Sequence, residues 1–149
     1  MSSDAPAGGR RRAGASAPHS IEQVLAAARQ GVHRLAPEDL HAAQAQGAHV
    51  LDLRSAATRE SEGHIPGATV IERLVLEWRL DPSSAHRMAG GPEHGDLVVM
   101  VCNEGFYSSL AARDLHDLGF HRATDLIGGF RAYADAGLPT AAEPTREVL

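Results

Sequence analysis

Cys102 is the residue whose type and surroundings point most directly to covalent chemistry. It follows the apolar run LVVMV at 97–101 and begins the segment CNEGFYSS, which leads into a helical pattern. Such a run is typical of a strand covered on both faces, and in α/β sheets binding sites form beyond the carboxyl ends of strands. Loop N–H groups and the helix dipole favour a thiolate there, and Gly105 permits a tight turn. Cys102 is therefore a candidate nucleophile.

The composition excludes several other kinds of site. Cys102 is the single cysteine among 149 residues, so the chain can form neither an internal disulfide nor a multi-cysteine metal centre. All 14 basic residues are arginine, which excludes a lysine Schiff base and a phosphate-loop lysine. The 9 histidines form no H-E-x-x-H pair and are scattered along the chain, so we expect no metal site. A net charge of −5 argues against nucleic acid as a partner.

The elements that must position Cys102 alternate along the chain. Strands are predicted at 32–35, 49–53, 69–72, 97–101 and 123–127. Helices are predicted at 21–30, 37–47, 73–80, 108–119 and 128–137, and a polar half-turn or short helix at 57–63. This order predicts an α/β domain with a parallel sheet and right-handed crossovers. We expect Trp78 to pack on the sheet, and Gly128 and Gly129 to let the last helix approach the Cys102 loop closely.

Four separated motifs resemble the rhodanese family. They are VLDLRSAATRESEGHIPGA at 50–68, CNEGFYSS with the strand before it, LAARDLHDLGF at 110–120 and LIGGFRAYADAGLP at 126–139. The resemblance covers about residues 33 to 140. It implies a rhodanese-like three-layer α/β fold, with a central five-stranded parallel sheet flanked by helices. It also implies a sulfurtransferase that carries sulfane sulfur as a persulfide, with no cofactor.

The resemblance assigns roles to individual residues. Cys102 matches the family nucleophile, and the loop expected to bind the persulfide comprises Asn103, Glu104, Gly105, Phe106, Tyr107 and Ser108. Asp52, Arg54 and His64 match motifs that mainly support the site. We expect Arg54 to pair with Asp52, contact with an anionic substrate being the alternative, and His64 to be a structural turn residue. The implied partners are a small donor (thiosulfate, polysulfide or persulfide) and a thiol, cyanide or protein acceptor.

The loop departs from the family pattern in its charge. Many single-domain members have arginine where this chain has Tyr107, and the loop carries Glu104 with no positive residue. A like charge about 6 Å from a bound anion costs roughly 0.7 to 3 kcal/mol, which predicts weaker use of thiosulfate if Glu104 faces the site. Phe106 and Tyr107 make the entrance more apolar, which suits a thiol or a protein partner.

Two other functions are weighed against the sulfurtransferase. A non-catalytic binding or redox and persulfide-sensing module would use the same cysteine without turnover. A phosphatase or arsenate reductase needs a phosphate-binding arginine at the sixth position after the cysteine, and that position is Ser108. The phosphatase interpretation is therefore disfavoured.

The chain is expected to divide into a disordered tail at 1–18, a rhodanese-like domain at 19–142 and a polar C-terminal tail at 143–149. No apolar run approaches the roughly 20 residues of a membrane-spanning helix, and no apolar segment follows the arginines at 10–12 as an export signal requires. We therefore expect a cytoplasmic protein with no membrane partner. The sequence does not indicate an oligomeric state.

Overall fold

The computed structural model describes residues 17–149, so all but the last two residues of the expected disordered tail lie outside the described residues. The helices are α1 (Ile21–Arg29), η2 (Pro37–Asp39), α2 (Leu40–Ala45), α3 (Ala56–Glu62), η3 (Arg73–Val75), α4 (Leu76–Leu80), α5 (Tyr107–His116) and α6 (Gly129–Asp135). The strands are β1 (His49–Asp52), β2 (Thr69–Ile71), β3 (Val98–Val101), β4 (Ala123–Asp125) and β5 (Glu147–Val148). Strands and helices alternate through most of the chain, as predicted.

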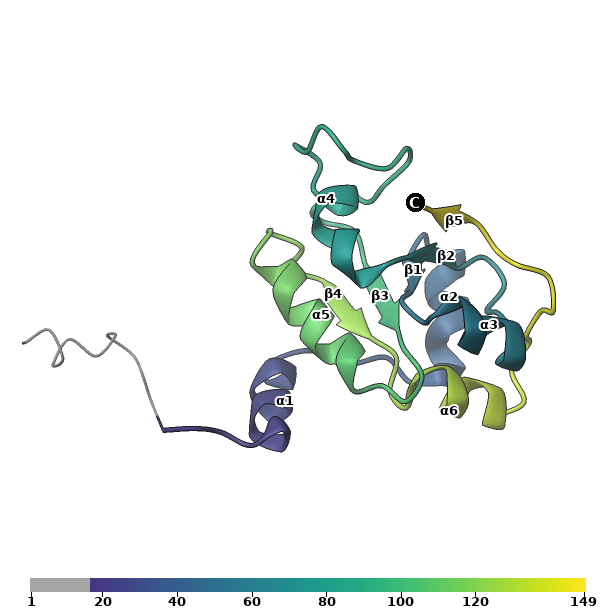
Figure 1. Ribbon diagram of the computed structural model, residues 1–149, viewed down its shortest axis with the longest axis horizontal. Coiled ribbons are helices and arrows are strands. Elements are labelled where there is room, and N and C mark those ends of the chain that lie inside the picture. Colours follow the sequence, from purple (N-terminus) through teal and green to yellow (C-terminus); the bar gives the residue numbers. More distant parts are fainter. Residues whose placement is uncertain (1–16) are drawn as a thin grey trace, which may run out of the picture.

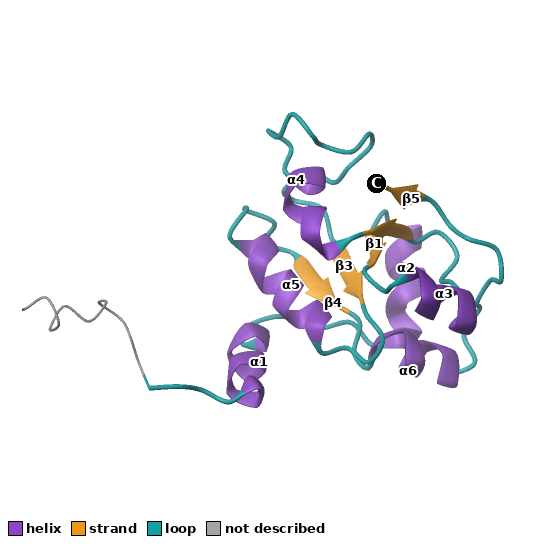
Figure 2. Cartoon of the chain, viewed as in Figure 1, coloured by secondary structure: helices purple, strands orange, loops and turns teal. Residues whose placement is uncertain are grey.

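The strands form one five-stranded parallel sheet in the order β4-β3-β1-β2-β5. Figure 1 shows α4 and α5 on one side of this sheet and α2, α3 and α6 on the other. Figure 2 shows the strands as the layer between the two groups of helices. The expected three-layer α/β fold with a central five-stranded parallel sheet is therefore confirmed.

β3 is covered by helices on both faces of the sheet, which accounts for the uninterrupted apolar run at 97–101. Val98 and Met100 pack in a cluster with residues of α4 and α5, whereas Val99 and Val101 pack in a second cluster with residues of α2 and α6. Successive side chains of a strand point to opposite faces, so a strand covered on both sides must be apolar at every position. β3 is therefore buried along its whole length, and it fixes the position of the residue that follows it.

Two parts of the sheet differ from the prediction. Residues 32–35 were expected to form a strand, but only Leu35 makes a bridge, to Leu126, because Pro37 begins a 3-10 helix directly afterwards. The fifth strand comes instead from residues 143–149, which were expected to be only a polar tail. There Glu147 and Val148 pair with β2 and cover its free edge.

Trp78 was expected to pack on the sheet, and it does not. Its side chain is 56% exposed, whereas Leu76 and Leu80 are fully buried. α4 comprises only residues 76–80, and residues four apart share one helix face. Trp78 lies midway between the two leucines in the sequence, so it faces away from the core.

Candidate functional site

Cys102 directly follows β3, as the sequence predicted, and β3 lies between β1 and β4 in the sheet. Its side chain is partly buried. The residues after it form a short loop, and α5 begins at Tyr107. The predicted loop therefore lies at the carboxyl edge of the sheet and leads into the N-terminus of a helix.

The N-terminus of α6 holds one side of this loop. The carbonyl oxygens of Cys102 and Asn103 accept hydrogen bonds from the backbone N–H groups of Phe130, at 2.9 Å, and Arg131, at 3.1 Å. A Cβ atom added at Gly129 would lie 2.6 Å from the Cys102 carbonyl oxygen. Glycine is therefore required for this approach, which confirms the predicted role of Gly129.

Two arginines hold the other side of the loop through the Gly105 carbonyl oxygen. It accepts hydrogen bonds from Arg29 Nη2 at 2.7 Å and from Arg34 Nη2 at 3.0 Å. Arg29 is the last residue of α1, which packs on α5. Burial and the neighbouring Arg34 lower the pKa of Arg29. Gly105 itself has a φ of +82°, so it adopts the tight turn that was predicted for it.

With these carbonyl groups held on the outside, the loop N–H groups are left to face the other way. The C=O and N–H of a trans peptide point in opposite directions. The backbone N–H groups of residues 103–107 donate to no acceptor among the described residues 17–149. The next N–H, that of Ser108, donates to Cys102 Sγ at 3.4 Å. The loop that follows the sulfur thus holds a set of free donors, which suits an anion.

A buried polar network begins at the same sulfur. Ser108 Oγ lies 3.2 Å from Cys102 Sγ and donates to Asp125 Oδ2 at 2.7 Å. Ser109 Oγ donates to the same carboxylate oxygen at 2.8 Å. Arg34 completes the network with Nε 2.7 Å from Asp125 Oδ1 and Nη2 3.1 Å from Oδ2. Asp125 is the last residue of β4 and is 1% exposed, so its buried carboxylate belongs to the hydrogen-bond network of the site.

The Glu104 carboxylate has a cationic partner. Its Oε2 lies 3.1 Å from Nη1 of Arg131, and the same guanidinium pairs with Glu62. Hydrogen bonding to Glu62, and then to Glu104, raises the pKa of Arg131. The Glu104 side chain is 54% exposed. The negative charge at this position of the loop is therefore compensated by α6, which the sequence around Cys102 did not indicate.

Phe106 and Tyr107, which close the loop, are exposed. Phe106 is 59% exposed and Tyr107 is 49% exposed. Aromatic side chains that remain in water next to a partly buried thiol form an apolar rim. This arrangement agrees with the apolar entrance that the sequence predicted.

Asp52, Arg54 and His64 lie buried beside the loop elements rather than in contact with the sulfur. Arg54 binds Asp52 through two of its nitrogens, Nε at 3.0 Å and Nη2 at 2.8 Å, and its guanidinium stacks on the Phe130 ring at 3.8 Å. His64 is buried, and its backbone pairs with Ala141. The predicted Asp52–Arg54 pair is confirmed.

Sequence reasoning missed the residues that come from distant elements. Arg29, Arg34 and Asp125 reach the loop from α1, from the segment before η2 and from β4. For Asp125 a signal existed, because it lies within the predicted buried strand at 123–127, where a charged side chain needs a partner. For the two arginines no local pattern distinguishes them from the other arginines of the chain.

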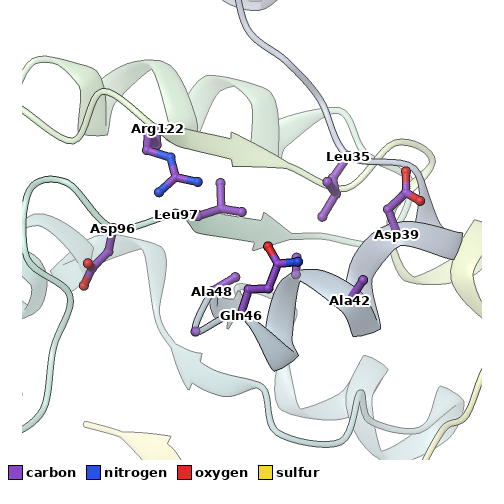
Figure 3. Close-up of a pocket in the computed structure, with 10 residues that line it drawn as sticks. Leu35, Asp39, Ala42, Gln46, Ala48, Asp96, Leu97 and Arg122 are labelled. Atoms are coloured by element: carbon purple, nitrogen blue, oxygen red, sulfur yellow. The ribbon is translucent and has the colours of Figure 1, made fainter.

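A cavity of about 550 Å³ lies away from Cys102. It borders α2 and the residues that enter β1, β3 and β4, and Figure 3 shows Asp39, Asp96 and Arg122 around it. It lacks a nucleophile. Among residues 17–149, no group of three or more His, Cys, Asp or Glu side chains could hold a metal ion. Within the same residues, no helix has the length and apolar character needed to cross a membrane.

Comparison with known proteins gives consistent matches. The model of the rhodanese-like domain family matches residues 36–136. Thiosulfate sulfurtransferase GlpE of Pseudomonas fluorescens is 32% identical over 114 residues, which cover 76% of this chain and 95% of that protein. Thiosulfate sulfurtransferase 16 of Arabidopsis thaliana, a chloroplastic protein, is 30% identical over 99 residues, which cover 64% of this chain and 82% of that protein.

Solved structures agree on the fold. The human single-domain sulfurtransferase superposes with a TM-score of 0.59 at 27% identity, covering 70% of this chain and 97% of the human one. A protein of unknown function from Rhodopseudomonas palustris, described as a possible tyrosine phosphatase, has a TM-score of 0.74 at 30% identity. That match covers 85% of this chain and 97% of the other.

Proposed function

Because the chain belongs to the rhodanese-like domain family, we propose that it is a sulfurtransferase that moves sulfane sulfur through a persulfide on Cys102. The observation that carries the proposal is the set of unpartnered N–H groups at 103–107, in the loop between Cys102 and the Ser108 N–H that donates to its sulfur, within the described residues. An anionic sulfur removed from water needs such converging donors. The proposed site residues are Cys102 and the loop Asn103, Glu104, Gly105, Phe106, Tyr107 and Ser108, supported by Asp52, Arg54 and His64.

The reaction is a double displacement. With thiosulfate as donor, the Cys102 thiolate attacks the outer sulfur, the new S–S bond forms and the bond to the sulfite group breaks, so that sulfite leaves with its electron pair. An acceptor thiolate then attacks the outer sulfur of the persulfide anion. It takes that sulfur and releases the Cys102 thiolate. No net oxidation occurs and no cofactor takes part.

The chain's own groups account for each requirement of this reaction. The loop N–H groups face the negative charge on the outer sulfur, and the N-terminus of α5 adds favourable dipole charge. Hydrogen bonds from α6 and from Arg29 and Arg34 keep the loop in this conformation before a donor binds. A preorganised set of donors stabilises charge without a cost of rearrangement during the reaction.

The donor and acceptor are proposed by chemical class. Phe106 and Tyr107 give the entrance an apolar rim, which favours a persulfide donor and a thiol or protein acceptor over a small dianion. The pairing of Glu104 with Arg131 reduces the penalty that this carboxylate imposes on thiosulfate. The expected cytoplasmic location stays a prediction, and it suits a chain whose single cysteine must remain a free thiol.

The geometry supports a phosphatase less well. Ser108 occupies the position where a phosphate-binding arginine is required, and its N–H donates to the sulfur. Arg29 and Arg34 do not replace that arginine, because both donate to the Gly105 carbonyl and Arg34 also binds Asp125. Neither Arg29 nor Arg34 therefore offers a free guanidinium fork for a tetrahedral oxyanion.

Intact-protein mass spectrometry tests the proposal. After incubation with thiosulfate, polysulfide, glutathione persulfide or a cysteine desulfurase with its substrate, the protein should gain the mass of one sulfur atom. Cys102→Ser should gain none, because the chain has no other thiol. A wild-type protein that gains no sulfur from any of these donors would exclude the sulfurtransferase. Sulfur gain without steady-state transfer to a thiol or cyanide would indicate the non-catalytic sensing module instead.

A further inference from the structure

The buried Asp125 carboxylate controls which hydrogen-bonding group Ser108 presents to Cys102. An ionised carboxylate only accepts hydrogen bonds, so the single hydroxyl hydrogen of Ser108 points to Asp125 Oδ2, 2.7 Å away. The same hydroxyl oxygen lies 3.2 Å from Cys102 Sγ. Ser108 therefore turns a lone pair toward the sulfur. A neutral S–H can donate to that lone pair, whereas a thiolate finds no donor in the hydroxyl.

The surrounding hydrogen bonds fix this orientation. Arg34 donates to both carboxylate oxygens of Asp125, so both oxygens act as acceptors. Arg29 Nε donates to Ser109 Oγ at 2.9 Å, so Ser109 must use its own hydrogen toward Asp125. Each donor in the network thus has one available direction. Asp125 is 1% exposed, so water does not compete for it.

We propose that Asp125 is a positioning residue that acts through Ser108 to hold the resting Cys102 in its thiol form, in opposition to the loop N–H groups that favour the thiolate. The inference rests on the proposed function, because it concerns the protonation of the nucleophile which that function requires. Its consequence is a nucleophile that reacts slowly with stray electrophiles and oxidants, since the thiolate is the reactive form.

Charged groups on all the elements around the loop enter the argument. Arg29 from α1 and Arg34 from the segment before η2 are cationic. On the loop itself Glu104 is paired with Arg131 of α6. Beyond these lie two further paired sets. Asp52, at the end of β1, pairs with Arg54, and Arg73 of η3 pairs with Glu77 of α4 and Asp114 of α5. Of the anionic groups around the loop, Asp125 is the one that accepts a hydrogen bond from Ser108, the residue whose hydroxyl contacts the Cys102 sulfur.

The test is the pH profile of Cys102 alkylation by iodoacetamide. In Asp125→Asn the Ser108 hydroxyl is released to donate to sulfur, and the positive charge of Arg34 loses its counter-ion. Both changes favour the thiolate, so the midpoint of the profile should fall by about one pH unit, a tenfold change in the thiolate-to-thiol ratio. Asp96→Asn, which removes a carboxylate at the opposite end of the sheet, is the matched control and should leave the midpoint in place.

Ser108→Ala provides a second variant that also decides the question if Asp125→Asn does not fold. It removes the acceptor of the thiol hydrogen, so its midpoint should fall as well. In the double variant the part of the Asp125→Asn effect that acts through Ser108 is absent and only the part due to Arg34 remains, so the shift should be smaller than the sum of the two single shifts. The proposal fails if the midpoint of either single variant is unchanged or higher, or if the two effects simply add.

Alkylation requires no sulfur donor, so this outcome is independent of the proposed function. A wild-type protein that gains no sulfur while Asp125→Asn lowers the midpoint would exclude the sulfurtransferase and keep the role of Asp125. Sulfur gain with an unmoved midpoint would keep the sulfurtransferase and exclude that role.

Discussion

Replacing Asp52 by alanine should destabilise the protein strongly, although the residue does not contact Cys102. The Arg54 side chain is 0% exposed, and Asp52 is its only carboxylate partner among residues 17–149. The variant would leave a buried guanidinium without a counter-ion. We expect the free energy of unfolding to fall by about 3–5 kcal/mol, the usual cost of breaking a buried pair from one side.

The structure places the change within that range. The carboxylate accepts from Arg54 Nε at 3.0 Å, from Nη2 at 2.8 Å and from its backbone N–H at 3.0 Å, and the variant loses all three hydrogen bonds. The guanidinium keeps its bond to the Gly63 carbonyl and its stacking on Phe130, so part of its compensation remains. With a urea slope of about 2 kcal/mol/M, the unfolding midpoint should fall by about 2 M.

Two controls separate burial from charge loss. Glu93→Ala breaks the ion pair with Arg87, but the Glu93 side chain is 69% exposed, and its loss should cost at most about 1 kcal/mol. Asp52→Ala combined with Arg54→Met leaves no buried charge and should be more stable than Asp52→Ala alone. If urea unfolding shows Asp52→Ala to cost no more than Glu93→Ala, the pair does not hold this region as argued.

Four further changes test other parts of the structure. Gly105→Ala should destabilise the protein by more than the roughly 1 to 2 kcal/mol that a left-handed alanine costs, because its Cβ would lie 2.7 Å from the backbone nitrogen of Gly128, the N-cap of α6. A thermal unfolding curve like that of the wild type would contradict this. Glu104→Gln and Tyr107→Arg should each raise kcat/KM for thiosulfate more than for a neutral persulfide donor, with a gain that salt reduces; equal changes for both donors would refute the electrostatic argument. The N–H of Glu93 lowers the pKa of Asp96, so Asp96 stabilises the fold above about pH 4, and this contribution is lost as the pH falls through the lowered pKa. Asp96→Asn should therefore flatten the dependence of Tm on pH below that point, and an unchanged dependence would refute it.

The parts of the fold that the sequence predicted are those determined by short-range patterns. The run at 97–101 has to be a strand buried on both faces, and that alone places Cys102 at the carboxyl edge of the sheet. The Ser20 and Gln23 side chains form the expected capping box. Gly129 meets the loop with no room for a Cβ, as expected. For the strand and the capping box the determining residues lie within a few positions of one another, whereas for Gly129 the local signal is the glycine pair that begins a helix.

The parts that the sequence did not predict depend on contacts between distant segments. β5 has only two residues, too few to show a periodic pattern, and it forms because β2 offers a free edge. Trp78 has a large apolar side chain of the kind found in protein cores. However, α4 comprises only residues 76–80 and can bury only one face. Neither the free edge nor the length of that helix can be seen in the local sequence.

The charge of the site shows the same limit most clearly. The sequence of the loop contains one carboxylate and no cation, which by itself predicts that the site binds anions weakly. The folded chain brings Arg131 to that carboxylate and places Arg29 and Arg34 on the Gly105 carbonyl. The last two arginines precede residue 36, where the family match begins. The electrostatics of the loop are therefore set partly by a segment outside the matched domain. A variant series confined to 102–108 would not reveal it, whereas Arg29→Gln and Arg34→Gln would.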